Sequence, residues 1–468
     1  MVDSEPVQQV TNKGKPKVFY EGFAYVMQKS LANDTSSFEC STRRKFGCHA
    51  RLHIKDGRII KILGKHEHAY PVNECESVAA VNSMKSRAQI CTSETTEQVL
   101  QNGLSDISED VLSYLPTTHN LKRRIRRHRA KKITPYINPT STQDLEIPEE
   151  MRKTISGDNF LLYDSGPSRN RILFFGTTTS LSILSKSSTL LGDGTFKITP
   201  SLFYQLYTVH ALFCGRVIPC VYVLMPDKKL STYQLVFDKI AELCPGIQPE
   251  YFMVDFEMAA IRAIRMSFIN TQVKGCFFHF SQCIYRKIQA VGLQSAYKNN
   301  SGLNLKMRMI AALAYLPVNK VEDGFEALAG ILPEEMNDLV TYFEENFIGI
   351  KRRNSRKPPI FNPQMWNMHE LIQKDLPRTN NSVEGYHNRL QNAISCSHPT
   401  IFKFLKLLQK DHARNTSEIA QTSSGHPQVS QRKIYKDLTL RIKTVLQTSS
   451  PEESVISTLE RIAVNIRY

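Results

Sequence analysis

The sequence lacks any long apolar run, and it is short of acidic residues and of tryptophan, of which there is one. A membrane-spanning helix needs about 20 nearly uncharged residues, whereas the best candidate, Tyr207–Met225, is interrupted by His210 and Arg216. The residues from Met1 to Lys15 are polar, so no secretory signal is expected. Since secretion is not expected, the cysteines are predicted to be thiols or metal ligands rather than disulfides.

The shortage of acids leaves the chain strongly positive. Its 468 residues contain 60 Lys and Arg against 44 Asp and Glu, a net charge of +16. Such a surplus predicts a polyanionic partner, either nucleic acid or an anionic membrane face. Apolar residues make up 41% of the chain, so most of it is expected to fold, with room for about two to four domains.

Composition and hydrophobic patterning divide the chain into five regions. They are a disordered tail at 1–15, a β-rich domain at 16–75, a linker at 76–140, an α/β domain at 141–412, and a linker with C-terminal helices at 413–468. The Asp56-Gly57 pair predicts a hairpin in the β-rich domain. From Thr189 the predicted order is β-β-β-α-β-α-β-α, which is typical of a mixed-sheet α/β fold. An all-helical insertion is expected at about 292–370.

A dense run of basic residues lies between 121 and 132. Its members are Lys122, Arg123, Arg124, Arg126, Arg127, Arg129, Lys131 and Lys132. Like charges this close repel each other unless a polyanion neutralises them. A solvated linker is one alternative, but the pattern favours a nuclear import signal or a DNA phosphate-binding helix.

Two cysteines and two histidines near the N-terminus have the residue types of a zinc site. Cys40, Cys48, His66 and His68 would supply two thiolates and two imidazoles, which suit tetrahedral zinc. His66 and His68 point to one side of an extended chain. A structural metal would also stabilise a domain that has too little apolar mass for a good core. The alternative is two ordinary cysteines and two surface histidines.

The residues around these four extend the pattern. They are Gly22, Tyr25, Phe38, Ala50-Arg51-Leu52 and His66-Glu67-His68. Over roughly residues 15–70 the sequence resembles a FLYWCH-type zinc finger, with Phe38 where that family usually has tryptophan. The resemblance implies a small β-sheet zinc domain that binds DNA or protein. Basic residues would give it a DNA-binding face: Arg43, Arg44, Lys45 and Arg51.

Three acids in the α/β region form a second pattern. Asp193 lies in the first predicted strand of the core, Asp255 ends a buried apolar strand, and Glu384 lies near the start of a helix. A buried acid is costly unless it is paired, protonated or metal-bound. Three carboxylates converging from two strands and a helix suit Mg²⁺ or Mn²⁺. Each acid alone has an ordinary alternative, such as a turn or helix-start residue.

The flanks of these acids resemble Mutator-like element (MULE) transposases over roughly residues 140–412. The matching motifs are Asp193-Gly194-Thr195-Phe196, Val254-Asp255-Phe256-Glu257, Gly275-Cys276-Phe277-Phe278-His279 and Arg378-Thr379-Asn380-Asn381 with Glu384. The resemblance implies an RNase H-like fold and an Asp-Asp-Glu triad, Asp193, Asp255 and Glu384, that is catalytic and binds two Mg²⁺ or Mn²⁺ ions. The family's helical insertion would account for the long interval before Glu384.

Four further residues are secondary candidates for this site. Glu257 would share a strand face with Asp255, and His387 lies one helical turn after Glu384. Cys276 and His279 would lie near the active site or help to hold DNA, and their alternative is a core cysteine with an orienting histidine. Trp366 is predicted to be a packing anchor rather than a base-stacking platform.

The combined prediction is a DNA-binding, MULE-type DNA transposase that cleaves and transfers DNA strands. It would carry structural Zn²⁺ in the finger, act in the nucleus on element ends and target DNA, and form a homo-oligomer, with no membrane or small-molecule substrate. The alternative is a host-adopted, catalytically silent DNA-binding or transcription-regulatory protein. A third possibility is an RNase H-like nuclease acting on RNA hybrids.

Overall fold

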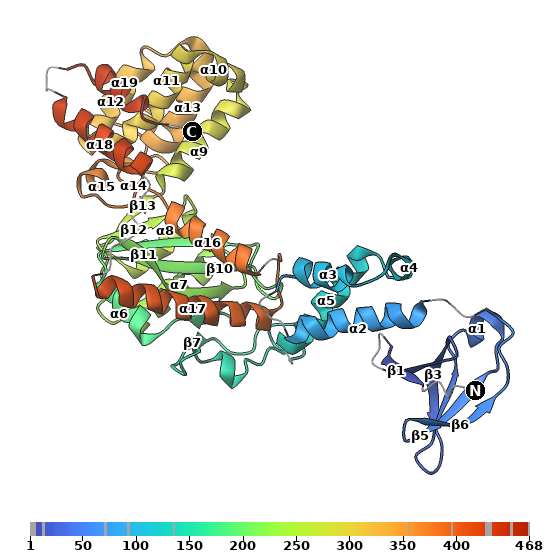
Figure 1. Cartoon of the computed structure of the whole chain (residues 1–468). Helices are drawn as coiled ribbons and strands as arrows, with labels where there is room; N and C mark the ends of the chain where they lie inside the picture. Colours follow the sequence, from blue (N-terminus) through green and yellow to red (C-terminus); the bar gives the residue numbers. More distant parts are fainter. Residues whose placement is uncertain are drawn as a thin grey trace. The chain divides into compact units, whose positions relative to one another are not determined.

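The computed structural model divides into two compact units, residues 1–136 and 137–468 (Figure 1). The residues that the structure describes are 6–11, 15–69, 73–90, 94–133, 136–353, 355–394, 396–425, 433–449 and 453–466. No helix among them is long and apolar enough to cross a membrane.

The first unit begins with a six-stranded antiparallel meander. Its strands are β1 (Val7–Val10), β2 (Pro16–Tyr20), β3 (Phe23–Ser30), β4 (Ser36–Cys40), β5 (Arg51–Lys55) and β6 (Arg58–Leu63), with the short helix α1 (Arg43–Phe46) after β4. The predicted hairpin at Asp56-Gly57 joins β5 to β6, and both turn residues have positive φ. Strand β1 corrects part of the tail prediction, because residues 7–10 pair with β2 instead of being disordered.

The region predicted to be a linker is instead largely helical. It contains α2 (Glu74–Ile90), α3 (Thr96–Ser105), α4 (Glu109–Leu112) and α5 (Thr118–Ile133). The helices α2, α3 and α5 pack around a small apolar cluster of their own. The linker prediction failed because these helices bury few apolar side chains in a segment rich in polar residues. The basic run lies within α5.

The second unit contains a seven-stranded mixed sheet in the order β13-β12-β9-β10-β11-β8-β7. The strands are β7 (Leu161–Asp164), β8 (Leu173–Phe175), β9 (Thr189–Thr195), β10 (Gln205–Phe213), β11 (Arg216–Met225), β12 (Tyr251–Val254) and β13 (Gln272–Gly275). Strand β9 pairs antiparallel with β10 and parallel with β12, which pairs parallel with β13. The chain therefore has the predicted α/β element order from Thr189 onward.

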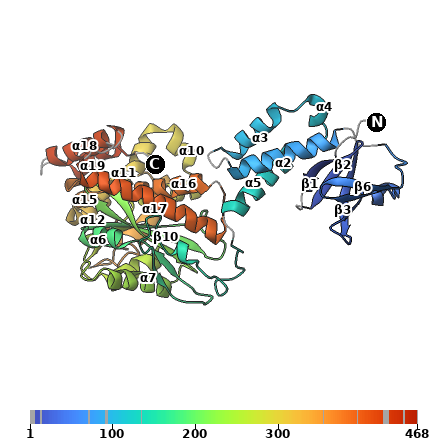
Figure 2. The same cartoon turned by 60° about the horizontal axis from the view of Figure 1, so that its bottom comes forward.

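Helices cover both faces of this sheet (Figure 2). On one face lie α6 (Thr178–Lys186), α7 (Leu230–Leu243) and α8 (Met258–Ser267), which share a core with Leu190, Val209 and Val254. On the other face lie α9 (Phe277–Ala290), α16 (Asn381–Ile394) and α17 (Ile401–Ser423). Because side chains alternate along a strand, Leu191 and Met253 point to this second face.

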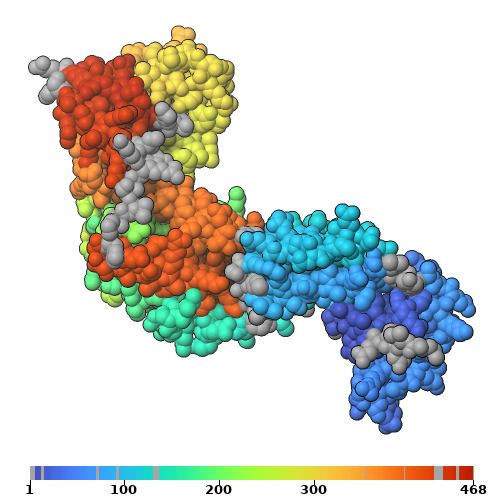
Figure 3. All heavy atoms as spheres, viewed as in Figure 1, coloured from blue at the N-terminus to red at the C-terminus, as the bar shows by residue number. Residues whose placement is uncertain are grey.

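The region predicted to be a helical insertion contains helices and no strand among its described residues. The helices are α10 (Gln294–Asn299), α11 (Ser301–Ala312), α12 (Val321–Ala329), α13 (Asn337–Phe343) and α14 (Pro363–Trp366), followed by α15 (His369–Gln373). The C-terminal helices α18 (Lys433–Thr448) and α19 (Val455–Ala463) pack beside them (red and yellow in Figure 3). Trp366 is a packing anchor, as predicted: it is fully buried and stacks on Phe280.

Candidate functional site

The four predicted zinc ligands lie together in the first unit. One ligand atom from each of Cys40, Cys48, His66 and His68 lies within 4.8 Å of all the others. Cys40 ends β4, Cys48 follows α1, and the two histidines follow β6 in an irregular segment. This is the only such group of three or more His, Cys, Asp or Glu side chains among the described residues.

The distances between the ligand atoms fit a tetrahedral zinc ion. With Zn–N and Zn–S bonds of about 2.0 and 2.3 Å, the ligand atoms should lie about 3.3–3.8 Å apart. Cys40 Sγ lies 3.4 Å from His68 Nε2, and Cys48 Sγ lies 3.3 Å from His66 Nδ1. The two ring nitrogens, His66 Nδ1 and His68 Nε2, are 3.2 Å apart. The set therefore has the donors and spacing that zinc needs.

The other nitrogen of each histidine ring also has a partner. His66 Nε2 lies 2.7 Å from the Tyr25 hydroxyl, and His68 Nδ1 lies 2.9 Å from the Ala69 carbonyl oxygen. Zinc-binding histidines usually donate this second N–H to an oxygen, which fixes the ring orientation. Burial raises the pKa of the Cys48 thiol and lowers the pKa of His66. A neutral His66 is the form that binds metal, whereas Cys48 would lose its proton on binding.

The basic residues predicted for the finger lie near this cluster. Arg44 and Lys45 are exposed on α1, and the Lys45 ammonium lies over the Phe46 ring, 4.9 Å from its centre. Arg43 forms an ion pair with Glu39. The exposed pair on α1 therefore offers charge to a partner, while Arg43 is already neutralised within the finger.

In the second unit, two of the predicted acids lie on, or directly after, two neighbouring parallel strands. Strands β9 and β12 pair through Phe252 with Leu190 and Met253 with Leu191. Asp193 lies within β9, two residues after Leu191, and Asp255 directly follows β12, two residues after Met253. By alternation the Asp193 side chain belongs to the sheet face that α9 and α16 cover. Asp193 is almost fully buried, with 9% of its surface exposed.

The third acid belongs to α16, which crosses the same face. Glu384 Oε1 lies 3.6 Å from His279 Nε2 on α9. One turn later, His387 Nδ1 lies 3.4 Å from Asp193 Oδ2. Helix α16 therefore contacts the first acid directly while carrying the third.

The pKa of Asp255 is affected by two neighbouring acids, Asp193 and Glu257. Burial, and then the negative charges of Asp193 and Glu257, raise the pKa of Asp255 from the usual 3.8 to about 6, while His279 and Lys228 act in the opposite direction. A cation beside these acids would offset the repulsion. The three predicted catalytic acids do not meet the 4.8 Å mutual spacing that the zinc cluster shows.

The secondary candidates have distinct positions around the acids. Glu257 immediately precedes α8 without a side-chain capping hydrogen bond, and it forms an ion pair with Lys228 at 2.5 Å. Cys276 is buried, which raises its pKa to about 11, and its sulfur accepts a hydrogen bond from the Asn380 backbone N–H. The Asn380 side chain donates to the Gly192 carbonyl oxygen. Cys276 and Asn380 thus fix the start of α16 against the sheet.

Sequence reasoning missed three residues around the acids: Thr208, His210 and Lys228. The Thr208 hydroxyl lies 2.8 Å from His387 Nε2 and 2.9 Å from His210 Nε2. A buried chain of polar groups therefore runs from Asp193 through His387 to Thr208 and His210. In the sequence, Thr208 and His210 were detectable only as a polar residue and a histidine inside a mainly apolar predicted strand. Lys228 had no such signal.

The geometry defines a protein with a zinc-binding β-sheet finger and a mixed α/β domain whose sheet carries a buried acid, Asp193. Each of these two parts matches a family model. Residues 9–68 match the FLYWCH zinc finger domain, and residues 189–283 match the MULE transposase domain. The predicted resemblance is therefore confirmed, and both domains support a DNA-binding protein of the transposase type. A search of curated proteins finds no match.

Proposed function

We propose that the protein is a MULE-type DNA transposase that cleaves and joins DNA strands with Asp193, Asp255 and Glu384. The observation that supports this proposal is that Asp255, directly after β12, interacts electrostatically with the buried Asp193 on the neighbouring strand β9. His387 of α16, the helix that carries Glu384, also contacts Asp193. The transposase match includes Asp193 and Asp255 and ends before Glu384. The role of Glu384 therefore rests on its position in α16 and on its contact with His279.

An RNase H-like core is the fold that this proposal requires. The five strands β9 to β13 support it: counted in sequence order they lie as 5-4-1-2-3, with only the second antiparallel to the others. The antiparallel strands β7 and β8 extend the sheet beyond β11. Asp193 then lies on the first strand of the motif, Asp255 directly after the fourth, and Glu384 on a helix that follows the motif.

The proposed chemistry assigns a role to each group. Bound Mg²⁺ or Mn²⁺ would activate a water or a 3′-hydroxyl and stabilise the departing oxygen. Asp193 and Asp255 would hold the ions from the sheet, and Glu384 would complete the set from α16. His387 would orient Asp193, because it contacts that carboxylate on one side and Thr208 on the other. The raised pKa of Asp255 fits a site that gains from nearby positive charge.

The finger would bind DNA, with zinc as a structural ion. Its exposed Arg44 and Lys45 lie on the short helix between the two cysteine ligands. Joining two element ends requires two active sites, so the working form would be at least a dimer. Acting on chromosomal DNA, the protein would work in the nucleus.

The second candidate is a DNA-binding regulator that keeps the fold without turnover. The spacing of the three acids favours this alternative, because they do not form a compact ligand set among the described residues. The two candidates differ in one measurable property, metal-dependent cleavage of DNA.

A cleavage assay tests the proposal. The substrate is a plasmid that carries the DNA flanking both sides of the gene, incubated with full-length protein and either Mg²⁺ or Mn²⁺. We expect metal-dependent cleavage that Asp193→Asn, Asp255→Asn and Glu384→Gln each abolish. Asp238→Asn on α7 is the matched control, because that acid is exposed on the opposite face of the sheet. Cleavage that persists in all three acid variants, or no cleavage by the unmodified protein, would overturn the assignment.

A further inference from the structure

Helix α5 lies outside both family matches, and it packs into the small helical bundle by one apolar edge. Leu121 and Ile125, one turn apart, are both buried. They join side chains of α2 and α3 in a cluster that includes Met84 and Leu100. The close approach of α2 and α3 at Gly103, where an added Cβ would meet Met84, makes this bundle a folded element rather than a linker.

The outward face of α5 carries unneutralised positive charge. Arg123, Arg126 and Arg127 are exposed, and their i, i+3 and i+4 spacing makes them neighbours on the helix surface. No ion pair or hydrogen bond to these three is found among the described residues. By contrast, the Lys122 ammonium lies 2.7 Å from Glu97, and Arg129 donates to the Ala88 carbonyl oxygen.

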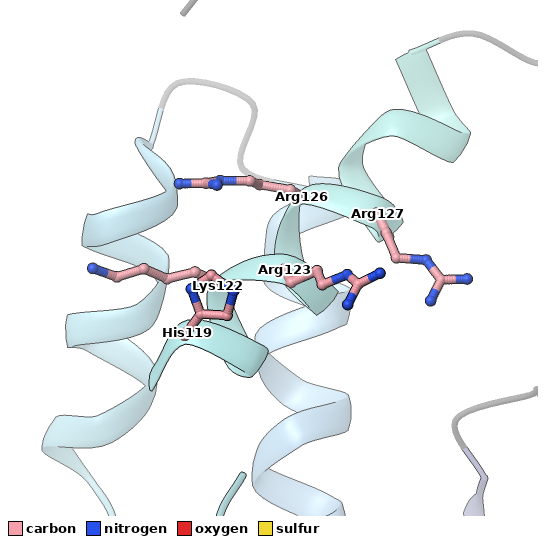
Figure 4. Close-up of a pocket in the computed structure, with 5 residues that line it drawn as sticks. All are labelled: His119, Lys122, Arg123, Arg126 and Arg127. Carbon is pink, nitrogen blue, oxygen red and sulfur yellow. The ribbon is translucent and has the colours of Figure 1, made fainter. Parts of the chain in front are cut away.

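A shallow hollow of about 460 Å³ accompanies this face. It is lined by His119, Lys122, Arg123, Arg126 and Arg127. Figure 4 shows Arg123 and Arg127 extending from one side of α5, and Lys122 and Arg126 from the other. The lining contains no acidic side chain, so the hollow suits a polyanion.

We propose that helices α2, α3 and α5 form a second DNA-binding module, in which α5 binds the phosphates of duplex DNA through Arg123, Arg126 and Arg127. The helix has 16 residues and no acid, so it is about 24 Å long, which is enough to span a groove of the duplex. Arginine side chains on an exposed helix face supply the phosphate contacts that fix a protein on DNA. The proposal concerns binding alone and stands whether or not the acids cleave DNA.

The packing of α5 distinguishes duplex DNA from the import signal that the sequence also allowed. An import signal is read as a short run of basic residues, whereas here the run is helical and its apolar residues are buried against α2 and α3. The free arginines are neighbours on a helix that this packing holds in place, and such a fixed array suits the regular phosphates of a duplex. Duplex DNA is therefore the ligand that this face of α5 suits.

Salt-dependent binding of the full-length protein tests this proposal. The probe is a fluorescein-labelled 30-base-pair duplex, followed by anisotropy between about 50 and 200 mM salt. Arg123→Ala/Arg126→Ala/Arg127→Ala should weaken binding at least about tenfold and reduce the slope of log Kd against log salt by about 0.9 for each phosphate that the variant no longer neutralises. The triple lysine variant keeps the charges and should keep most of the slope.

Arg262→Ala/Arg265→Ala on α8 is the matched control, because those arginines are also exposed and three residues apart. It should leave the slope unchanged. A triple alanine variant that keeps its helix content and zinc but binds DNA with an unchanged slope would overturn the proposal. The same result together with failure of the variant to enter nuclei would identify the basic run as an import signal instead. Asp193→Asn separates this proposal from the catalytic one, since it should abolish cleavage while leaving the slope intact.

Discussion

At the residue scale, His387 is the side chain that connects the proposed acid Asp193 to Thr208 on the neighbouring strand β10. One ring nitrogen contacts Asp193 and the other contacts Thr208, so the ring is held from both sides. Groups that orient metal-binding carboxylates typically change metal affinity or activity by about 10–100-fold when they are removed. His387 is therefore a positioning residue in the proposed reaction, not a group that reacts.

His387→Ala should lower the cleavage rate by about 10–100-fold and raise the Mg²⁺ or Mn²⁺ concentration needed for half-maximal activity. Binding of duplex DNA should not change. His412→Ala on α17 controls for lost packing, because His412 is similarly buried and contacts Phe160 rather than one of the three proposed acids. Equal loss of activity in both variants, with an unchanged metal requirement, would show that His387 serves stability alone.

The zinc ligands allow a second residue-scale prediction. Cys48→Ser should remove the zinc that full-length protein binds and unfold the finger, because structural zinc contributes about 10–16 kcal/mol in small zinc domains. Zinc content by mass spectrometry and proteolysis of residues 15–69 would measure both effects. Cys75→Ser is the control, since Cys75 lies on α2 outside the cluster. Full zinc content in Cys48→Ser would remove Cys48 from the ligand set.

At the element scale, β9 and α16 each carry a glycine next to a proposed acid, and the two have opposite requirements. An added Cβ at Gly192 would lie 2.4 Å from the Tyr207 hydroxyl and 3.0 Å from Phe252. An added Cβ at Gly385 would meet nothing within 4 Å. Strand β9 therefore needs glycine for close packing, whereas α16 does not.

Gly192→Ala should destabilise the second unit by about 1–3 kcal/mol through overpacking. Gly385→Ala should stabilise it by about 0.5–1 kcal/mol, because alanine loses less conformational freedom than glycine in a helix. Urea unfolding followed by circular dichroism would measure both changes. If Gly192→Ala is as stable as the unmodified protein, β9 is not packed as tightly as its contacts indicate.

The elements differ in how far the sequence could predict them. The central strands were predictable because they are buried on both faces and give short apolar runs, such as Tyr251–Val254. The helical bundle was missed although Val81, Met84 and Ala88 have helical i, i+3, i+7 spacing. The contact between His387 and Asp193 could not be predicted, because the pairing of α16 with β9 depends on the tertiary fold.

At the scale of the whole molecule, the two units have separate apolar cores. The clusters of the finger and of the helical bundle contain residues of the first unit alone. The two large clusters around the mixed sheet contain residues of the second unit alone. Elements that share an apolar core tend to unfold together. Loss of zinc should therefore affect the unfolding of the first unit, and overpacking of the sheet should affect that of the second.

Calorimetry of the full-length protein should therefore show at least two unfolding transitions. Removing zinc with a chelator should lower or abolish the transition of the first unit, because the metal stabilises only the state that binds it. Gly192→Ala should lower the other transition and leave the first in place. The zinc-free protein should also retain the binding of duplex DNA that depends on α5, because the helical bundle has its own apolar cluster. One transition that shifts in both experiments would show that the units unfold together, and loss of α5-dependent binding with the zinc would show that the bundle requires the finger.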